Sequence, residues 1–87
     1  MTDSFRRHSR SLTAPPENGA AVAPDDAADL PAVTRALYVG GAGDLAVRMA
    51  DGTRLVFGAV PAGTLLPVRV ARVLATGTSA TRVIGLW

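Results

Sequence analysis

The sequence lacks several side chains from which small reactive sites are built. It contains no cysteine and no lysine, and its single histidine is His8. The lack of cysteine excludes disulfide bridges, thiolate zinc sites and cysteine catalysis. The lack of lysine excludes lysine nucleophiles and the phosphate-binding lysine of a Walker motif. We therefore predict a protein that is not an enzyme and that holds neither a cofactor nor a metal ion.

Long apolar runs are missing as well. The 87 residues make at most one domain. No run approaches the roughly 20 apolar residues that a membrane-spanning helix needs. The first residues are acidic, polar and basic rather than apolar, so they do not form a secretory signal. We expect a protein that is made in the cytoplasm and does not contact a membrane.

Proline and charge divide the chain near residue 33. Residues 1–33 hold four of the six prolines and five of the seven acidic residues, and most of their apolar side chains are alanine. Alanine buries too little area to offset the entropy lost when a chain is ordered. We predict an extended or disordered amino-terminal arm over residues 1–33 and a β domain over residues 34–87.

The β domain is predicted from an alternation with period two. Leu45, Val47 and Met49, for example, alternate with smaller or charged side chains. The pattern indicates about five strands, near 35–39, 44–50, 53–58, 65–75 and 81–87, in an all-β antiparallel meander that forms a small sandwich or barrel. The alternation slips before Val73, which predicts a β-bulge or a crossing between sheets near Ala71 and Arg72.

Short glycine, proline and polar segments separate these strands. They lie at 40–43, 50–52, 60–63 and 76–79. The glycines of 40–43 favour a tight reversal between the first two strands, Asp51 with Gly52 is a hairpin signal, and Pro61 with Gly63 fits a type I turn.

Two patterns resemble functional motifs. Residues 41–46 (GAGDLA) match the glycine fingerprint of dinucleotide-binding folds, but that fingerprint must open a helix, and here a period-two segment follows. Asp44 and Asp51 are the carboxylates of the β domain. Both lie beside glycine in predicted turns, where aspartate commonly accepts hydrogen bonds from the backbone, so we predict that they are structural.

The small size of the β domain predicts association. A core built from about 54 residues seldom contributes more than about 3–5 kcal/mol of net stability. Disulfides and metals are excluded, so contacts with other chains are the remaining reinforcement. Trp87 is suited either to cover the sheet or to anchor a subunit contact.

Longer blocks of the sequence carry a resemblance to a known family. Residues 34–44 (TRALYVGGAGD), 60–70 (VPAGTLLPVRV) and 73–78 (VLATGT), with the final Leu86 and Trp87, are similar to the spike-base proteins of gene transfer agents and related tailed phages. The similarity extends over residues 29–87, and residues 1–28 show no comparable match.

The resemblance implies a structural role outside a capsid. Proteins of this family form the base of a head spike at the five-fold vertices and carry a spike or fibre that helps the particle adhere to the surface polysaccharide of a recipient cell. The implied partners are copies of this chain in a pentamer, the major capsid protein and the spike or fibre protein.

On this hypothesis the candidate functional residues lie on surfaces. Leu65, Leu66, Leu86 and Trp87 are the candidates for the contact between subunits. Phe5 with Arg6, Arg7 and Arg10 is the candidate tether of the arm to the capsid or to a neighbouring subunit.

The alternative hypothesis is a basic β module that binds nucleic acid. Residues 35–87 carry six arginines against two acids, which attract a polyanion. These arginines alternate with aliphatic residues, however, and not with the aromatic platforms on which single strands stack.

Overall fold

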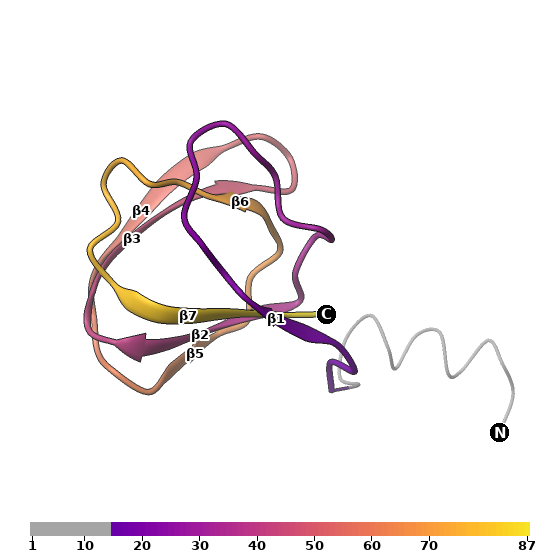
Figure 1. Cartoon of the computed structure of the whole chain (residues 1–87), viewed down its shortest axis with the longest axis horizontal. Helices are drawn as coiled ribbons and strands as arrows, with labels where there is room; N and C mark the ends of the chain where they lie inside the picture. The colour runs from indigo at the N-terminus through magenta and orange to yellow at the C-terminus, as the bar shows by residue number, and fades with distance from the viewer. Residues whose placement is uncertain (1–14) are drawn as a thin grey trace, which may run out of the picture.

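The computed structural model describes residues 15–87, which form seven strands and no helix (Figure 1). The strands are β1 (Gly19–Ala21), β2 (Ala36–Gly41), β3 (Gly43–Met49), β4 (Arg54–Val60), β5 (Thr64–Leu66), β6 (Val70–Val73) and β7 (Thr81–Leu86). Every strand pair is antiparallel. The predicted all-β fold class is confirmed. In this part of the chain no helix long and apolar enough to span a membrane is found.

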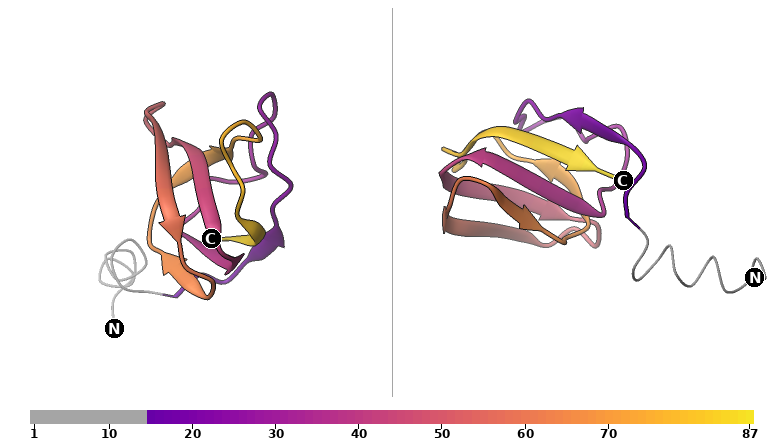
Figure 2. Two further views of the ribbon diagram at one scale, coloured as in Figure 1. Left: turned by 90° about the vertical axis from the view of Figure 1, so that its left-hand side faces the viewer. Right: turned by 90° about the horizontal axis from the view of Figure 1, so that it is seen from below.

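The strands form two sheets that face each other (Figure 2). Sheet A has four strands in the order β1-β7-β2-β5, and sheet B has three in the order β4-β3-β6. Two antiparallel sheets that share one layer of inward side chains make a β-sandwich. On one side of the sandwich the sheets end with β4 and β5, and on the opposite side they end with β6 and β1.

The core between the sheets is aliphatic. Leu37 and Val39 of β2 and Leu45 and Val47 of β3 are fully buried, as their period-two spacing requires. Phe57 packs against this cluster from β4. Further strands and one loop complete the buried cluster with Val60, Val70, Val73, Ala80 and Val83.

The chain changes sheet between β2 and β3. The predicted reversal at 40–43 is wrong, because β2 pairs with β5 and β7, whereas β3 pairs with β4 and β6. The glycines there allow a close approach of two chain segments instead. A Cβ on Gly43 would lie 2.6 Å from the backbone nitrogen of Ala80. Only glycine leaves room for this corner.

The β3–β4 connection is the hairpin that Asp51 and Gly52 predict. The two strands pair up to Arg48 and Arg54, and Gly52 has a φ of 96°. Gly63, with a φ of 82°, lies in the predicted turn between β4 and β5. Both turns lie where they are predicted, but the Gly63 nitrogen donates to the Val39 carbonyl and not back to Val60, so the closing hydrogen bond of the predicted type I turn is not formed.

The single strand predicted over 65–75 is divided between the sheets. Pro67 follows β5 and has no N–H with which to continue a ladder. In β6, Arg72 pairs with Arg48 and Val70 pairs with Met49, so Ala71 is an additional residue. The bulge near Ala71 is confirmed, whereas the crossing between sheets lies at residues 67–69, before the position where the slip predicts it.

Residues 15–34 run along one side of the sandwich. β1 extends sheet A beyond β7. The chain then follows the outer edge of β6 and caps its backbone groups. The hydrogen bonds run from the nitrogens of Asp25, Leu30 and Thr34 to the carbonyl oxygens of Val73, Ala71 and Val70. This edge of sheet B is therefore covered by the chain itself.

Thr34 fastens the end of this segment. It is the one buried polar residue of the described chain, with no exposed surface. Its hydroxyl donates a hydrogen bond to the Val68 carbonyl at 2.9 Å and accepts one from the Val70 nitrogen at 3.0 Å. The chain just before β2 of sheet A is thereby bonded to the segment that leads into β6 of sheet B.

Candidate functional site

The carboxylates of the β domain, Asp44 and Asp51, accept hydrogen bonds from the backbone. Asp44 Oδ1 accepts a hydrogen bond from the Ala59 nitrogen at 2.8 Å, where Ala59 has a φ of 52°. Asp51 Oδ1 accepts one from the Thr53 nitrogen at 2.9 Å, and this bonding lowers the pKa of Asp51 below its ordinary value of 3.8. Both aspartates accept backbone hydrogen bonds, as predicted, although Asp44 lies in β3 and not in a turn. Within residues 15–87 no three histidine or acidic side chains gather as metal ligands.

The glycine fingerprint at 41–46 lies in extended chain. Gly41 ends β2, and Gly43 begins β3. No helix starts there, so the helix amino terminus that holds a pyrophosphate in dinucleotide-binding folds is missing. The sequence match marks the corner between the sheets.

Asp26 and Asp29 attach residues 15–34 to sheet B. Asp26 accepts hydrogen bonds from the Thr76 hydroxyl at 2.6 Å and from the Thr76 nitrogen at 2.9 Å. These bonds, the hydroxyl first, lower the pKa of Asp26 below 3.8. Asp29 Oδ1 lies 2.9 Å from Arg72 Nε and 3.5 Å from Arg48 Nη1. These polar groups hold the fold together.

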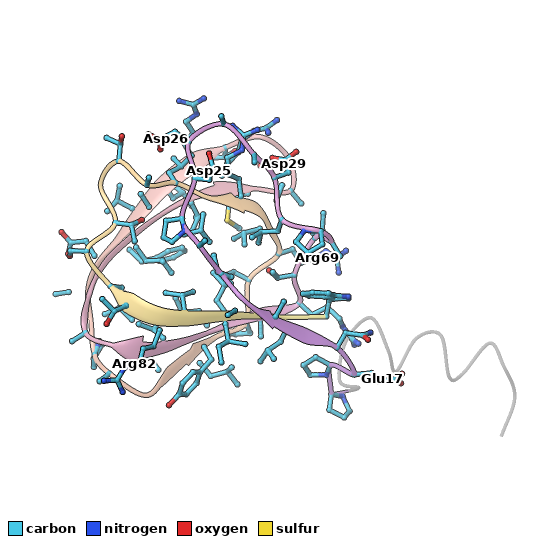
Figure 3. The ribbon with its side chains drawn as sticks, viewed as in Figure 1. Glu17, Asp25, Asp26, Asp29, Arg69 and Arg82 are labelled. Carbon is cyan, nitrogen blue, oxygen red and sulfur yellow. The ribbon has the colours of Figure 1, made fainter. Side chains whose placement is uncertain are left out.

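The arginines of the β domain do not form one continuous surface. Arg48 and Arg72 pair with Asp29. The exposed Arg69 and Arg82 lie at opposite ends of the molecule (Figure 3). A groove that follows a nucleic-acid backbone requires cations along its length, and this arrangement does not supply one.

The four candidate interface residues fall into two groups. Leu65 and Leu66 belong to β5, the edge strand beside β4; Leu65 is 57% exposed, and Leu66 packs against the core. Leu86 pairs with Gly19 of β1, and the half-buried Trp87 exchanges backbone hydrogen bonds with Asn18. The two groups therefore lie toward opposite sides of the sandwich (Figure 2). Phe5, Arg6, Arg7 and Arg10 lie outside the described residues.

An exposed apolar row crosses the outer face of sheet A. Tyr38 of β2 pairs with Leu65 of β5 on one side and with Ile84 of β7 on the other. Tyr38 is 39% exposed and Ile84 is 37% exposed. Tyr38 alternates with the buried Leu37 and Val39, so its side chain lies on the face opposite the core.

The edge strand β4 exposes an apolar side chain on each of its two faces, because Leu55 lies opposite the core residue Val47 and Val56 lies on the other face, opposite Ala46. Leu55 is 43% exposed and Val56 is 61% exposed, and β4 pairs only with β3 within the described chain. Next to it lies a shallow hollow of 340 Å³, whose walls are mainly apolar and include Met49, Leu55 and Arg69. Three consecutive apolar residues after the hairpin turn indicate this edge in the sequence, but none of them is among the predicted interface residues.

Taken together, these features define a small all-β module whose exposed groups form contact surfaces rather than a reactive pocket. A solved structure gives the relationship. A chain in the "capsid of native GTA particle computed with C5 symmetry", where GTA denotes a gene transfer agent, is 38% identical to this chain, with a TM-score of 0.80. The match covers 99% of this chain and 100% of the other. This chain therefore belongs to the same family of gene transfer agent capsid proteins. No protein-family model matches it, and no curated protein matches it.

Proposed function

We propose that this protein forms the base of a head spike at the five-fold vertices of a phage-like capsid. It links the capsid to a spike or fibre that helps the particle adhere to the surface polysaccharide of a host cell. The observation that supports this proposal most directly is the 38% identity, over nearly the whole chain, to a component of a gene transfer agent capsid computed with five-fold symmetry.

The physical character of the module supports this role. Its described residues do not gather into a catalytic site. The two carboxylates of the β domain, Asp44 and Asp51, accept hydrogen bonds from backbone nitrogens. Large apolar side chains instead remain exposed on the face of sheet A and along β4. Exposed apolar surface of this kind marks contacts with other proteins.

Around a five-fold axis, copies of the protein would make a pentameric ring. Such a ring needs a head-to-tail contact between two different surfaces of each copy. Leu65 and Leu66 lie toward one side of the sandwich, and Leu86 and Trp87 lie toward the other. We assign these two groups to the two halves of the contact between neighbouring subunits.

The amino-terminal arm is the proposed tether. Phe5 offers an apolar anchor, and Arg6, Arg7 and Arg10 offer charge for the capsid or for a neighbouring subunit. Deletion of residues 1–12 should leave the β domain folded and reduce the number of decorated particles. Full decoration by the truncated protein would contradict this assignment.

The proposed function is tested by removing the gene from a producing cell. Particles without the protein should still form and carry DNA, but they should lose the spike or fibre protein and bind less host polysaccharide. Re-expression of the full chain is the control and should restore both properties. Particles that keep their fibres and their adhesion without this protein would refute the proposal.

A further inference from the structure

The four sheet edges of the sandwich are protected to different degrees. The edge of β6 is capped by residues 25–34, and β1 and β5 have only three residues each. β4 has seven residues from Arg54 to Val60, and no strand of the described chain pairs with its outer side. Natural proteins protect a long edge because its free backbone groups pair readily with another chain.

The backbone groups that β4 leaves free can be identified. Ala46 of β3 lies opposite Val56, but the backbone groups of Ala46 bond to Leu74 and Thr78 on the other side of β3. In an antiparallel pair, such a position is one that does not exchange hydrogen bonds. The N–H and C=O of Val56 therefore point away from the sandwich, toward a place where a further strand would lie.

The β1 edge offers matching groups on the opposite side of the molecule. Asn18 and Val22 bond to Trp87 and Val83, so the alternating positions Gly19 and Ala21 direct their backbone groups outward. Gly19, Ala20 and Ala21 are small. They allow a neighbouring strand with larger side chains, such as Leu55 and Val56, to approach closely.

The charges of these two edges are complementary. Residues 15–34 contain Glu17, Asp25, Asp26 and Asp29 and no basic residue. Glu17 and Asp25 form no ion pair within residues 15–87, and Figure 3 shows both on the segment that includes β1. β4 carries Arg54 and no acidic residue, and the charge of Arg54 also acts on Asp26 of the same chain, where it helps to lower the pKa. Opposite charges favour β4 against β1, whereas two β4 strands side by side would bring like charges together.

We propose that the β4 edge of one copy pairs with the β1 edge of the next copy, so that the sheets of neighbouring subunits join head to tail. The geometry is that of β-strand addition, with backbone hydrogen bonds for affinity and the hollow beside Leu55 for a partner side chain. The choice of a second copy as the partner rests on the proposed ring. A contact between two different edges on opposite sides of the chain can be repeated from copy to copy until a ring closes. A contact of β4 with β4 uses the same edge of both copies, so no third copy can be added and only a dimer forms.

Disulfide cross-linking tests this contact without background, because the chain contains no cysteine. The full-length Val56→Cys variant is combined in turn with Gly19→Cys, Ala20→Cys and Ala21→Cys. Strands that pair lie about 4.8 Å apart, which is within the reach of a disulfide. Each variant is oxidised as purified protein and in particles from producing cells, and is then separated on a non-reducing gel.

The expected result is a ladder of covalent oligomers in at least one double variant and no ladder in the single variants. Tyr38→Cys with Ala21→Cys is the matched control, because Tyr38 is exposed on the face of a sheet rather than at an edge; it should give no ladder. Efficient dimers of Val56→Cys alone would overturn the proposal in favour of β4 against β4. A cross-link to a different particle protein would overturn it in favour of a foreign strand.

The same experiment separates this proposal from the proposed function. If the purified protein gives a ladder of covalent oligomers but the protein is not found in particles, the edge pairing is supported and the capsid role is refuted. Protein present in particles, with no ladder from any double variant there or in solution, would keep the capsid role and refute the edge pairing.

Discussion

Thr34 provides a sharp test of how the segment before β2 is fixed. Its buried hydroxyl donates a hydrogen bond to the Val68 carbonyl at 2.9 Å and accepts one from the Val70 nitrogen at 3.0 Å. Thr34→Val keeps the shape of the side chain and removes both hydrogen bonds. A buried donor or acceptor left without a partner costs about 1–3 kcal/mol. The two together should lower the free energy of unfolding by roughly 2–4 kcal/mol, a large part of the stability of a small domain.

Thr34→Ser is the matched control. It retains the hydroxyl and removes the methyl group Cγ2, which lies beside Gly85. The loss of one methyl group should lower the free energy of unfolding by only about 1 kcal/mol. Urea unfolding followed by circular dichroism and by the fluorescence of Trp87, the single tryptophan, gives both values. In thermal unfolding, 2–4 kcal/mol corresponds to a drop of roughly 10–25 °C for a chain of this size. A loss no greater for Thr34→Val than for Thr34→Ser would refute the reasoning.

Three further outcomes are expected. Gly43→Ala should lower the free energy of unfolding by about 1–3 kcal/mol, because its Cβ would lie 2.6 Å from a backbone nitrogen. Gly58→Ala is the control: the nearest atom to its Cβ is 3.9 Å away, so the free energy of unfolding should be nearly unchanged. Equal losses in the two variants would contradict the close approach at the corner. The Thr76 hydrogen bonds hold the pKa of Asp26 below 3.8, so their contribution to stability is present above pH 3.8 and is lost as the pH falls through the lower, folded pKa. Thr76→Val should raise that pKa toward 3.8 in an NMR titration, and an unchanged value would show that another group sets it. Val56→Pro should weaken self-association roughly 5–10-fold in sedimentation, the effect of one lost hydrogen bond, while the unfolding temperature is kept; undiminished association would show that this N–H is not used.

The sequence predicted the local features of the fold better than its global pairing. Period two identified the inward face of β3, and the slip before Val73 located the bulge at Ala71, although the chain crosses between the sheets earlier, at residues 67–69. Asp51 with Gly52 located the hairpin. Each of these is a local property, determined by residues that are near one another in the chain.

The pairing of distant strands could not be predicted in the same way. An alternating pattern states which face of a strand is buried, but it does not state which strand lies beside it. The glycines at 40–43 suit a hairpin and a corner equally, and only the packing of Ala80 against Gly43 distinguishes the two. The three residues of β1 bear no alternation of their own, because their pairing depends on β7 at the other end of the chain.

The same limit applies to the candidate functional surfaces. Leu65 and Leu86 were selected as apolar residues near predicted edges, and the structure places them toward different sides of the sandwich. The β4 edge was missed because an unpaired strand is defined by what its neighbours do. Its acidic counterpart was visible in the sequence only as a difference in charge between two segments.

A reconstruction of the capsid vertex, in particles that carry the full-length chain, tests the central claim most directly. We predict sandwich-shaped density outside the shell, repeated five times around the axis, with the β4 side of each copy against the β1 side of the next. Bare vertices, or the same sandwich found only at another position in the particle, would contradict it.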